Sequence, residues 1–200
     1  LAERSGDFDA MEKQLQVAID SNPDAPRPRV ALARYRTSQG NPEAAIRLLS
    51  PVERSNAQSF SLQHAMANAY LANESPAFAL DSARRALELQ PQQPAALVLA
   101  ARAEQANGRY EVAQKHIEEA LALRNDVSVR KMLVENLLQQ NKLDGALEQL
   151  EALPEAERLA PAAQLLVGRI AMAQERYSEA EAVFLSLFEA RRDVTSLFHM

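Results

Sequence analysis

The sequence predicts an all-α repeat fold, an α-solenoid in which antiparallel helix pairs stack along the chain. Three observations indicate it: a short turn phrase recurs at a near-constant interval, apolar residues between the turns follow helical spacing, and prolines fall between the units. The clearest copy of the phrase is QANGRYEVAQ at 105–114, where Gly108, Tyr110 and Ala113 stand close together. A chance similarity would not recur at a fixed interval, so the constant spacing of the phrase is the main evidence for a repeat protein.

The turn positions are residues 6, 40, 74, 108, 141 and 175, separated by 34, 34, 34, 33 and 34 residues. A fixed period of this length is the signature of a repeat protein, in which each unit packs against its neighbours. We therefore expect a single array over 1–200. Its expected parts are the second helix of one repeat at 1–24, five full repeats at 26–59, 60–93, 94–126, 127–160 and 161–192, and the start of a further repeat at 193–200.

Apolar residues at three- and four-residue spacing place the helices in chain order. After a lone second helix at 7–20, the helix pairs are expected at 27–38 and 42–52, 58–72 and 76–89, 94–106 and 110–123, 126–140 and 143–152, and 160–174 and 177–191. Pro23 and Pro91 fall between units, where the chain must leave one helix and reverse. Pro51 lies in the last turns of its helix, so we expect a kink or an early end at Ser50. The stretch ALPEAERLAP at 152–161 lengthens the junction before the final unit.

Small residues predict where the two helices of a unit cross. Seven residues before the turns stand Ala33, Ala67, Ala101, Val134 and Gly168, and five residues after them stand Ala45, Ala79, Ala113, Ala146 and Ala180. Small side chains allow helix axes to approach to about 8 to 10 Å. The aromatic residues Phe8, Tyr110 and Tyr177, each two residues after a turn, are expected to cover the start of the second helix.

These features resemble the tetratricopeptide repeat, which has 34 residues, two antiparallel helices, a small residue in each helix at the crossing, an aromatic after the turn and a proline near the unit's end. The tryptophan often seen early in the first helix is absent, and Leu97 is the nearest substitute. The resemblance implies a right-handed superhelix whose first helices line a concave groove, where proteins of this family usually hold a peptide or helix of a partner. Phrases such as QGNPEAAIRLLSP and RYSEAEAVF also resemble long bacterial arrays associated with envelope exopolysaccharide export or exosortase systems, which implies a periplasmic scaffold.

The resemblance places the groove-facing residues thirteen, ten, six and three positions before each turn. The candidates for partner binding are Val30, Arg34, His64, Asn68, Leu71, Val98, Arg102, Lys131, Glu135, Leu165, Arg169 and Met172. The guanidinium group of arginine pairs well with carboxylates, so Arg34, Arg102 and Arg169 predict that the bound partner segment is acidic. Other side chains of that segment are expected to contact the aliphatic candidates. In the alternative interpretation the arginines are solvated or pair with acids on neighbouring helices, which adds little affinity.

A family subgroup that binds a terminal carboxylate uses a clamp of lysines and asparagines at fixed positions. This chain does not match that clamp, because only Lys131 is retained and Glu135 stands where an asparagine is needed.

The composition argues against several other functions. Basic residues number 22 against 27 acidic residues, which disfavours nucleic-acid binding, and no segment has the roughly 18 to 20 consecutive apolar residues of a membrane span. Cysteine is absent, the three histidines His64, His116 and His199 lack metal-ligand spacing, and no glycine-rich phosphate loop is present. We therefore expect no enzyme, no metal site and no cofactor. The compartment stays open between cytoplasm and periplasm, since a cysteine-free chain fits both.

A structural spacer or self-association module is the alternative function. The segments GDFDAMEKQL and DVTSLFHM look like unpaired parts of repeats, and unpaired ends of an array expose apolar surface. Either flanking repeats are missing or the chain forms a homo-oligomer through Phe184, Phe188 and Leu197.

Overall fold

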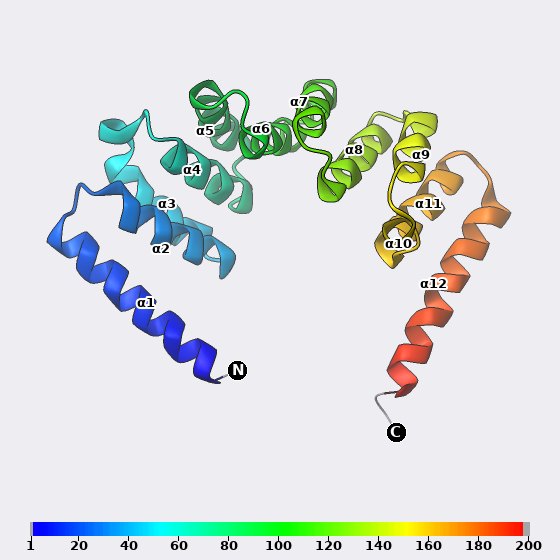
Figure 1. Ribbon diagram of the computed structural model, residues 1–200, viewed down its shortest axis with the longest axis horizontal. Coiled ribbons are helices and arrows are strands. Elements are labelled where there is room, and N and C mark those ends of the chain that lie inside the picture. Colours follow the sequence, from blue (N-terminus) through cyan, green and yellow to red (C-terminus); the bar gives the residue numbers. More distant parts are fainter. Residues whose placement is uncertain (1, 198–200) are drawn as a thin grey trace. The chain divides into compact units, whose positions relative to one another are not determined.

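A computed structural model defines the backbone of residues 2–197 and the side chains of residues 10–190. Every regular element in this part of the chain is a helix, which confirms the predicted all-α class (Figure 1). The helices form two compact units, an N-terminal unit of Leu1–Arg109 and a C-terminal unit of Tyr110–Met200.

The N-terminal unit consists of successive helix pairs. Its elements are α1 (Ala2–Ser21), α2 (Pro26–Ser38), α3 (Pro42–Glu53), the short 3₁₀ helix η1 (Arg54–Asn56), α4 (Phe60–Ala72), α5 (Pro76–Leu89) and α6 (Pro94–Ala106). Helix α2 packs against α3, and α4 packs against α5. Helix α4 also contacts both α2 and α6, so the first helices of successive pairs are neighbours.

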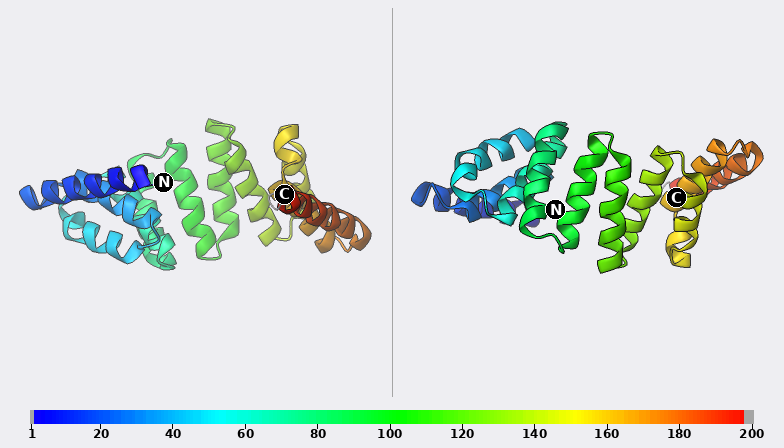
Figure 2. Two further views of the ribbon diagram at one scale, coloured as in Figure 1. Left: turned by 90° about the horizontal axis from the view of Figure 1, so that it is seen from below. Right: turned by 90° about the horizontal axis from the view of Figure 1, so that it is seen from above.

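The C-terminal unit continues the pairing with one added segment. Its elements are α7 (Tyr110–Leu123), α8 (Val127–Gln139), α9 (Leu143–Glu151), α10 (Glu155–Arg158), α11 (Pro161–Ala173) and α12 (Tyr177–Leu197). Helix α8 packs against α9 and α11 against α12, and the two further views show these partners side by side (Figure 2). The one-turn helix α10 lies in the long junction that the sequence indicates at 152–161.

The helix bounds agree with the sequence except at a few places. Helices α2 to α9 and α11 begin and end within two residues of the predicted positions. The expected early end at Ser50 is wrong: α3 runs through Pro51 to Glu53 and passes directly into η1. Pro51 has no N–H to give to the Arg47 carbonyl four residues earlier, and because both residues are exposed, water can replace the lost bond. Helix α12 runs six residues beyond its predicted end at 191. Helix α1 begins at Ala2 instead of residue 7, so the predicted turn at position 6 is wrong.

The five turns described inside helix pairs share one backbone conformation. Their residues all have positive φ: Gly40 at 74°, Glu74 at 52°, Gly108 at 73°, Asn141 at 57° and Glu175 at 60°. In each turn the following residue donates its N–H to the carbonyl five positions back, as Ser75 does to Tyr70 at 2.9 Å. This is the Schellman arrangement, which satisfies carbonyls left over at a helix C-terminus. The recurring phrase of the sequence therefore encodes a recurring helix end.

The predicted crossing residues lie in buried positions. All ten are buried, among them Ala45, Ala79, Ala113, Ala146 and Ala180, each 0% exposed. The prediction for Tyr177 is wrong, because its side chain is 60% exposed. Tyr110, at the same repeat position, is half-buried. Phe8 lies outside the residues whose side chains the structure describes.

Candidate functional site

The first helices of the N-terminal unit gather four of the predicted groove residues into one polar row. The row consists of Arg34 from α2, His64 and Asn68 from α4, and Arg102 from α6. Arg102 Nη1 donates a hydrogen bond to Asn68 Oδ1 at 3.1 Å. Asn68 Nδ2 donates to the His64 carbonyl at 2.9 Å and lies 3.2 Å from His64 Nδ1. The row therefore links α6 to α4 through side chains.

The electrostatics of the row keep His64 uncharged. Burial lowers the pKa of His64 below its ordinary value, and the positive charges of Arg34 and Arg102 lower it further. A neutral imidazole can accept the Asn68 N–H at Nδ1, which leaves the ring proton on Nε2. At neutral pH the positive charge of the row thus comes from two arginines, both exposed. Arg102 uses one guanidinium donor on Asn68, so further donors face solvent.

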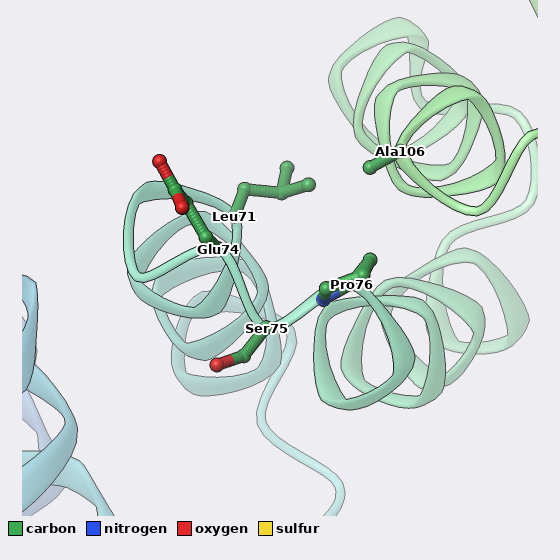
Figure 3. Close-up of a pocket in the computed structure, with 5 residues that line it drawn as sticks. All are labelled: Leu71, Glu74, Ser75, Pro76 and Ala106. Carbon is green, nitrogen blue, oxygen red and sulfur yellow. The ribbon is translucent and has the colours of Figure 1, made fainter.

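A small pocket lies next to the polar row. It has a volume of about 280 Å³ and is lined by Leu71, Glu74, Ser75, Pro76 and Ala106. Leu71 and Pro76 point toward Ala106, while the Glu74 carboxylate points away from the apolar residues (Figure 3). Leu71 follows Asn68 by three residues on α4, and Ala106 follows Arg102 by four on α6. Residues at these spacings share a helix face, so the pocket lies one turn beyond the row.

Sequence reasoning identified only Leu71 among the residues that line this pocket. Ala106 and Pro76 were missed, because an alanine and a helix-starting proline carry no chemical signal of their own. The available signal was positional, since both stand two residues from a turn position, Ala106 before Gly108 and Pro76 after Glu74.

Two further candidates of the N-terminal unit are less accessible. Val30 is 5% exposed and packs in the core cluster with Ala33, Ala45 and Leu49, so its side chain supports the fold rather than the surface. Val98 is half-buried on α6, four residues before Arg102 and on the same helix face.

The candidates of the C-terminal unit stand on α8 and α11. Lys131 Nζ lies 2.7 Å from Glu157 Oε2, and Glu157 belongs to the one-turn helix α10 that the sequence did not predict. Glu135 on α8 is exposed. Leu165 and Met172 on α11 are 48% and 47% exposed, and Arg169 between them is exposed as well. Arginine and aliphatic residues thus share one face of α11, while the Lys131 charge is already paired.

The described residues form neither a metal site nor a membrane span. No group of three or more histidine, aspartate or glutamate side chains among them is arranged to hold a metal ion. No described helix combines the length and the apolar character that a membrane crossing requires.

Comparison with known proteins identifies the repeat. The family profile for the tetratricopeptide repeat matches residues 131–193. No curated protein matches the chain in sequence. Among solved structures, TPR-like repeats from Podosopora anserina, described as nearly identical repeats of a kinesin light chain, are similar at 22% identity and TM-score 0.72, covering 86% of this chain and 98% of that one.

Two other solved structures are similar to this chain over most of its length. YrrB, a TPR protein described as having an unusual peptide-binding site, is similar at 19% identity and TM-score 0.69, covering 92% of this chain and 96% of that one. MamA is similar at 16% identity and TM-score 0.67, covering 82% and 97%. Residues 131–193 are therefore tetratricopeptide repeats, and the chain has the tetratricopeptide repeat fold.

Proposed function

We propose that the protein is an interaction scaffold whose N-terminal unit binds an acidic peptide segment of a partner protein on the face of α2, α4 and α6. The polar row carries this proposal. Its two arginines are exposed, and the charges of both act on the same imidazole, so they lie close enough to meet one ligand. Guanidinium groups bind carboxylates through paired hydrogen bonds, which suits them to aspartate and glutamate side chains.

The hydrogen bond from Arg102 to Asn68 adds to the suitability of the row. A long side chain loses rotamer freedom when it binds, and this loss weakens affinity. Asn68 holds Arg102 in place before a ligand arrives, and His64 in turn contacts the Asn68 amide. The row is therefore partly ordered in advance, which reduces the entropy lost on binding. YrrB, whose description includes a peptide-binding site, supports the proposal by analogy of fold.

The test compares peptides selected by three proteins from a random peptide display library. The wild type is expected to enrich acidic peptides. The double variant Arg34→Glu/Arg102→Glu is expected to lose that enrichment while circular dichroism shows unchanged helix content. The control Arg47→Glu/Arg124→Glu makes the same change in net charge at side chains that are each 70% exposed, and should keep the enrichment. Enrichment of the same acidic peptides by the Arg34/Arg102 variant would refute the proposal.

A finer proposal concerns the assembly in which the scaffold acts. The similarity of QGNPEAAIRLLSP and RYSEAEAVF to bacterial envelope arrays supports a role in an exopolysaccharide-export or exosortase-associated system. Pull-down from an envelope extract with the wild type and with Arg34→Glu/Arg102→Glu tests it. Recovery of polysaccharide-export components by the wild type alone is expected, and equal recovery by both proteins would contradict it.

Self-association is the second candidate, because α12 exposes large apolar side chains. Leu185 is 54% exposed and Phe188 is 59% exposed, whereas Phe184 is half-buried. Leu197 lies outside the residues whose side chains the structure describes. Sedimentation velocity over a range of concentrations should show a growing oligomer fraction that Leu185→Ser/Phe188→Ser removes. A wild type that stays monomeric at high concentration would exclude this candidate.

A further inference from the structure

The pocket beside the polar row has room for an aliphatic side chain. Its volume of about 280 Å³ is close to the lower end of the range of about 300–1,000 Å³ that is usual for small-molecule sites. Leu71, Pro76 and Ala106 present apolar atoms to it. Two of these residues continue the same helix faces that carry Asn68 and Arg102. A peptide lying on the row is therefore in position to place one apolar side chain in the pocket.

Charges of both signs lie near the pocket. The polar row with Arg34 and Arg102 lies one helical turn before the pocket, and Glu74 lines the pocket from the end of α4, with its carboxylate directed away from the apolar residues (Figure 3). Glu74 sits in the left-handed turn after α4, at φ 52°, where the next residue, Ser75, donates its N–H to the Tyr70 carbonyl. A ligand with an acidic residue beside Glu74 would suffer like-charge repulsion, and one with a basic residue there would gain attraction. The surface thus discriminates between ligands by the order of acidic and basic residues along the segment as well as by their charge.

The spacing of the two parts sets the spacing within the ligand. Three to four residues of helix separate the row from the pocket, which corresponds to roughly 4.5 to 6 Å along the axis. In an extended peptide, side chains on the same face are two residues apart, or roughly 6.5 to 7 Å. An acidic residue two positions from an aliphatic residue therefore reaches the row while the aliphatic side chain enters the pocket.

We infer that the N-terminal unit selects extended partner segments in which one aliphatic residue is flanked, two positions away, by an acidic residue on one side and a basic residue on the other. The aliphatic side chain enters the pocket of Leu71, Pro76 and Ala106, the acidic residue meets Arg102, and the basic residue meets Glu74. This inference rests on the proposed peptide binding and specifies the chemistry of the bound segment.

The test uses four fluorescein-labelled peptides. Every residue in them is serine except at the three positions of the acidic, the aliphatic and the basic residue. The first peptide carries aspartate, leucine and lysine, in that order, at alternate positions. The second carries them in the opposite order, because the side-chain contacts do not determine in which direction the peptide runs along the surface. The third replaces leucine by serine. The fourth replaces lysine by aspartate. Fluorescence anisotropy gives the Kd of each. The wild type should bind the better of the first two about tenfold or more tightly than the third, because a buried leucine contributes that much.

Two protein variants identify the pocket as the cause. Ala106 is exposed, so Ala106→Phe should leave the fold intact while filling the pocket. This variant should lower the affinity for the leucine peptide to that for the serine peptide. Its affinity for the serine peptide should equal that of the wild type. Glu74→Lys should favour the fourth peptide over the first by about two- to fivefold, the reverse of the wild type. Circular dichroism checks the helix content of both variants.

The outcomes separate the inference from the proposal on which it rests. If the wild type binds the leucine and serine peptides equally and Arg34→Glu/Arg102→Glu abolishes both, acidic peptide binding stands and the pocket inference is overturned. Unchanged leucine preference in Ala106→Phe overturns the inference as well. If the wild type binds none of the peptides and the display selection yields no acidic sequences, the proposed function fails and the inference fails with it.

Discussion

The same repeat positions carry different chemistry in the two units. In the N-terminal unit the residues six and ten positions before one turn are Asn68 and His64, and Asn68 hydrogen-bonds both His64 and Arg102 on the next first helix. In the C-terminal unit the equivalent position on α8 carries Lys131, whose charge is paired with Glu157. Glu157 comes from α10, in the lengthened junction between repeats. The repeat position thus determines where a side chain lies in the fold. The segment between repeats determines whether its charge is paired, as the charge of Lys131 is with Glu157.

The two units also differ in how their helix pairs close. The N-terminal unit uses alanine on both sides of its crossings, as with Ala67 and Ala79, each 0% exposed. The last pair of the C-terminal unit places Gly168 opposite the ring of Phe184. A Cβ added at Gly168 would stand 2.5 Å from Phe184 Cε1, closer than real Cβ contacts come. In this pair the large Phe184 ring on α12 fits because Gly168 on α11 has no side chain.

The largest expected effect in this comparison comes from Gly168→Ala. Overpacking a close-packed interior costs about 1 to 3 kcal/mol, and the ring edge of Phe184 has to move. Alanine is favoured over glycine within a helix by roughly 0.5 to 1 kcal/mol, so urea denaturation should show a net loss in the free energy of unfolding that is smaller than the overpacking cost by this amount. Phe184→Leu in the same chain should recover much of the loss, because the two residues are in contact and their effects are coupled.

Gly145→Ala is the matched control in the same unit. An added Cβ there meets nothing closer than Leu137 Cδ1 at 3.7 Å, which is ordinary contact. Replacing a helical glycine by alanine stabilises by roughly 0.5 to 1 kcal/mol, so this variant should be more stable than the wild type. Equal losses in both glycine variants would mean that packing against Phe184 is not the cause.

The crossing residues show how much of the fold could be predicted. The interval of 33 or 34 residues located the turns, and the small residues at fixed distances from them located the crossings, since a close helix contact excludes large side chains. The contact between Gly168 and Phe184 could not be predicted, because it depends on how far one ring reaches across a pair. The same applies to Tyr177, which is 60% exposed although Tyr110 at the same repeat position is half-buried.

The turns provide the second test, because glycine at some turns and glutamate at others adopt one conformation. Gly40 has φ 74° and an added Cβ would meet nothing within 4 Å, so Gly40→Ala isolates the cost of the left-handed backbone. That cost is roughly 1 to 2 kcal/mol for a residue with a side chain. Glu175 already bears it at φ 60°, so Glu175→Gly should raise the free energy of unfolding by up to about 1 kcal/mol.

Thermal unfolding of both turn variants checks these signs. A decrease in Tm is expected for Gly40→Ala and an increase for Glu175→Gly. If Glu175→Gly lowers Tm, the ion pair of Arg176 with Glu179 at 2.6 Å or another local contact, rather than backbone conformation, controls this turn.

The candidate site was predicted in part. The polar row was reachable from sequence, because the tetratricopeptide resemblance fixes the groove-facing positions and the residue types at those positions are polar. Val30 occupies an equivalent position but is buried among Ala33, Leu49 and other core residues. The pairing of Lys131 depends on α10, a four-residue helix with no periodic signal to predict it. Short segments of this kind take their structure from tertiary contacts rather than from local pattern.

Glu157→Gln tests the role of the junction in the C-terminal unit. The pair of Lys131 and Glu157 is partly exposed, so its loss should lower the free energy of unfolding by roughly 0.2 to 1 kcal/mol at low salt. The difference from the wild type should disappear at about 1 M salt, where charges are strongly screened. Arg47→Gln, which breaks the more exposed pair with Glu43, should have a smaller effect. A salt-independent loss in Glu157→Gln would indicate packing instead of charge.

The smallest effect belongs to His64 and sharpens the description of the polar row. Its lowered pKa means that the folded protein resists protonation more than the unfolded chain, whose histidine titrates near 6.5. The full contribution of neutral His64 to stability is therefore present above about pH 6.5 and is lost as the pH falls toward the lower folded pKa. His64→Gln removes this titration, so the wild type should lose stability relative to the variant as the pH falls through this range.

Arg102→Gln separates the causes of the His64 shift. Burial contributes most to the lowered pKa, followed by Arg34 and then Arg102, so removing the Arg102 charge should raise the His64 pKa only slightly. NMR titration of the imidazole measures this value in both proteins. An acidic peptide on the row would shift the pKa in the same direction, because a nearby carboxylate favours the protonated ring. A His64 pKa that ignores both the substitution and a bound acidic peptide would show that the row does not act as one electrostatic site.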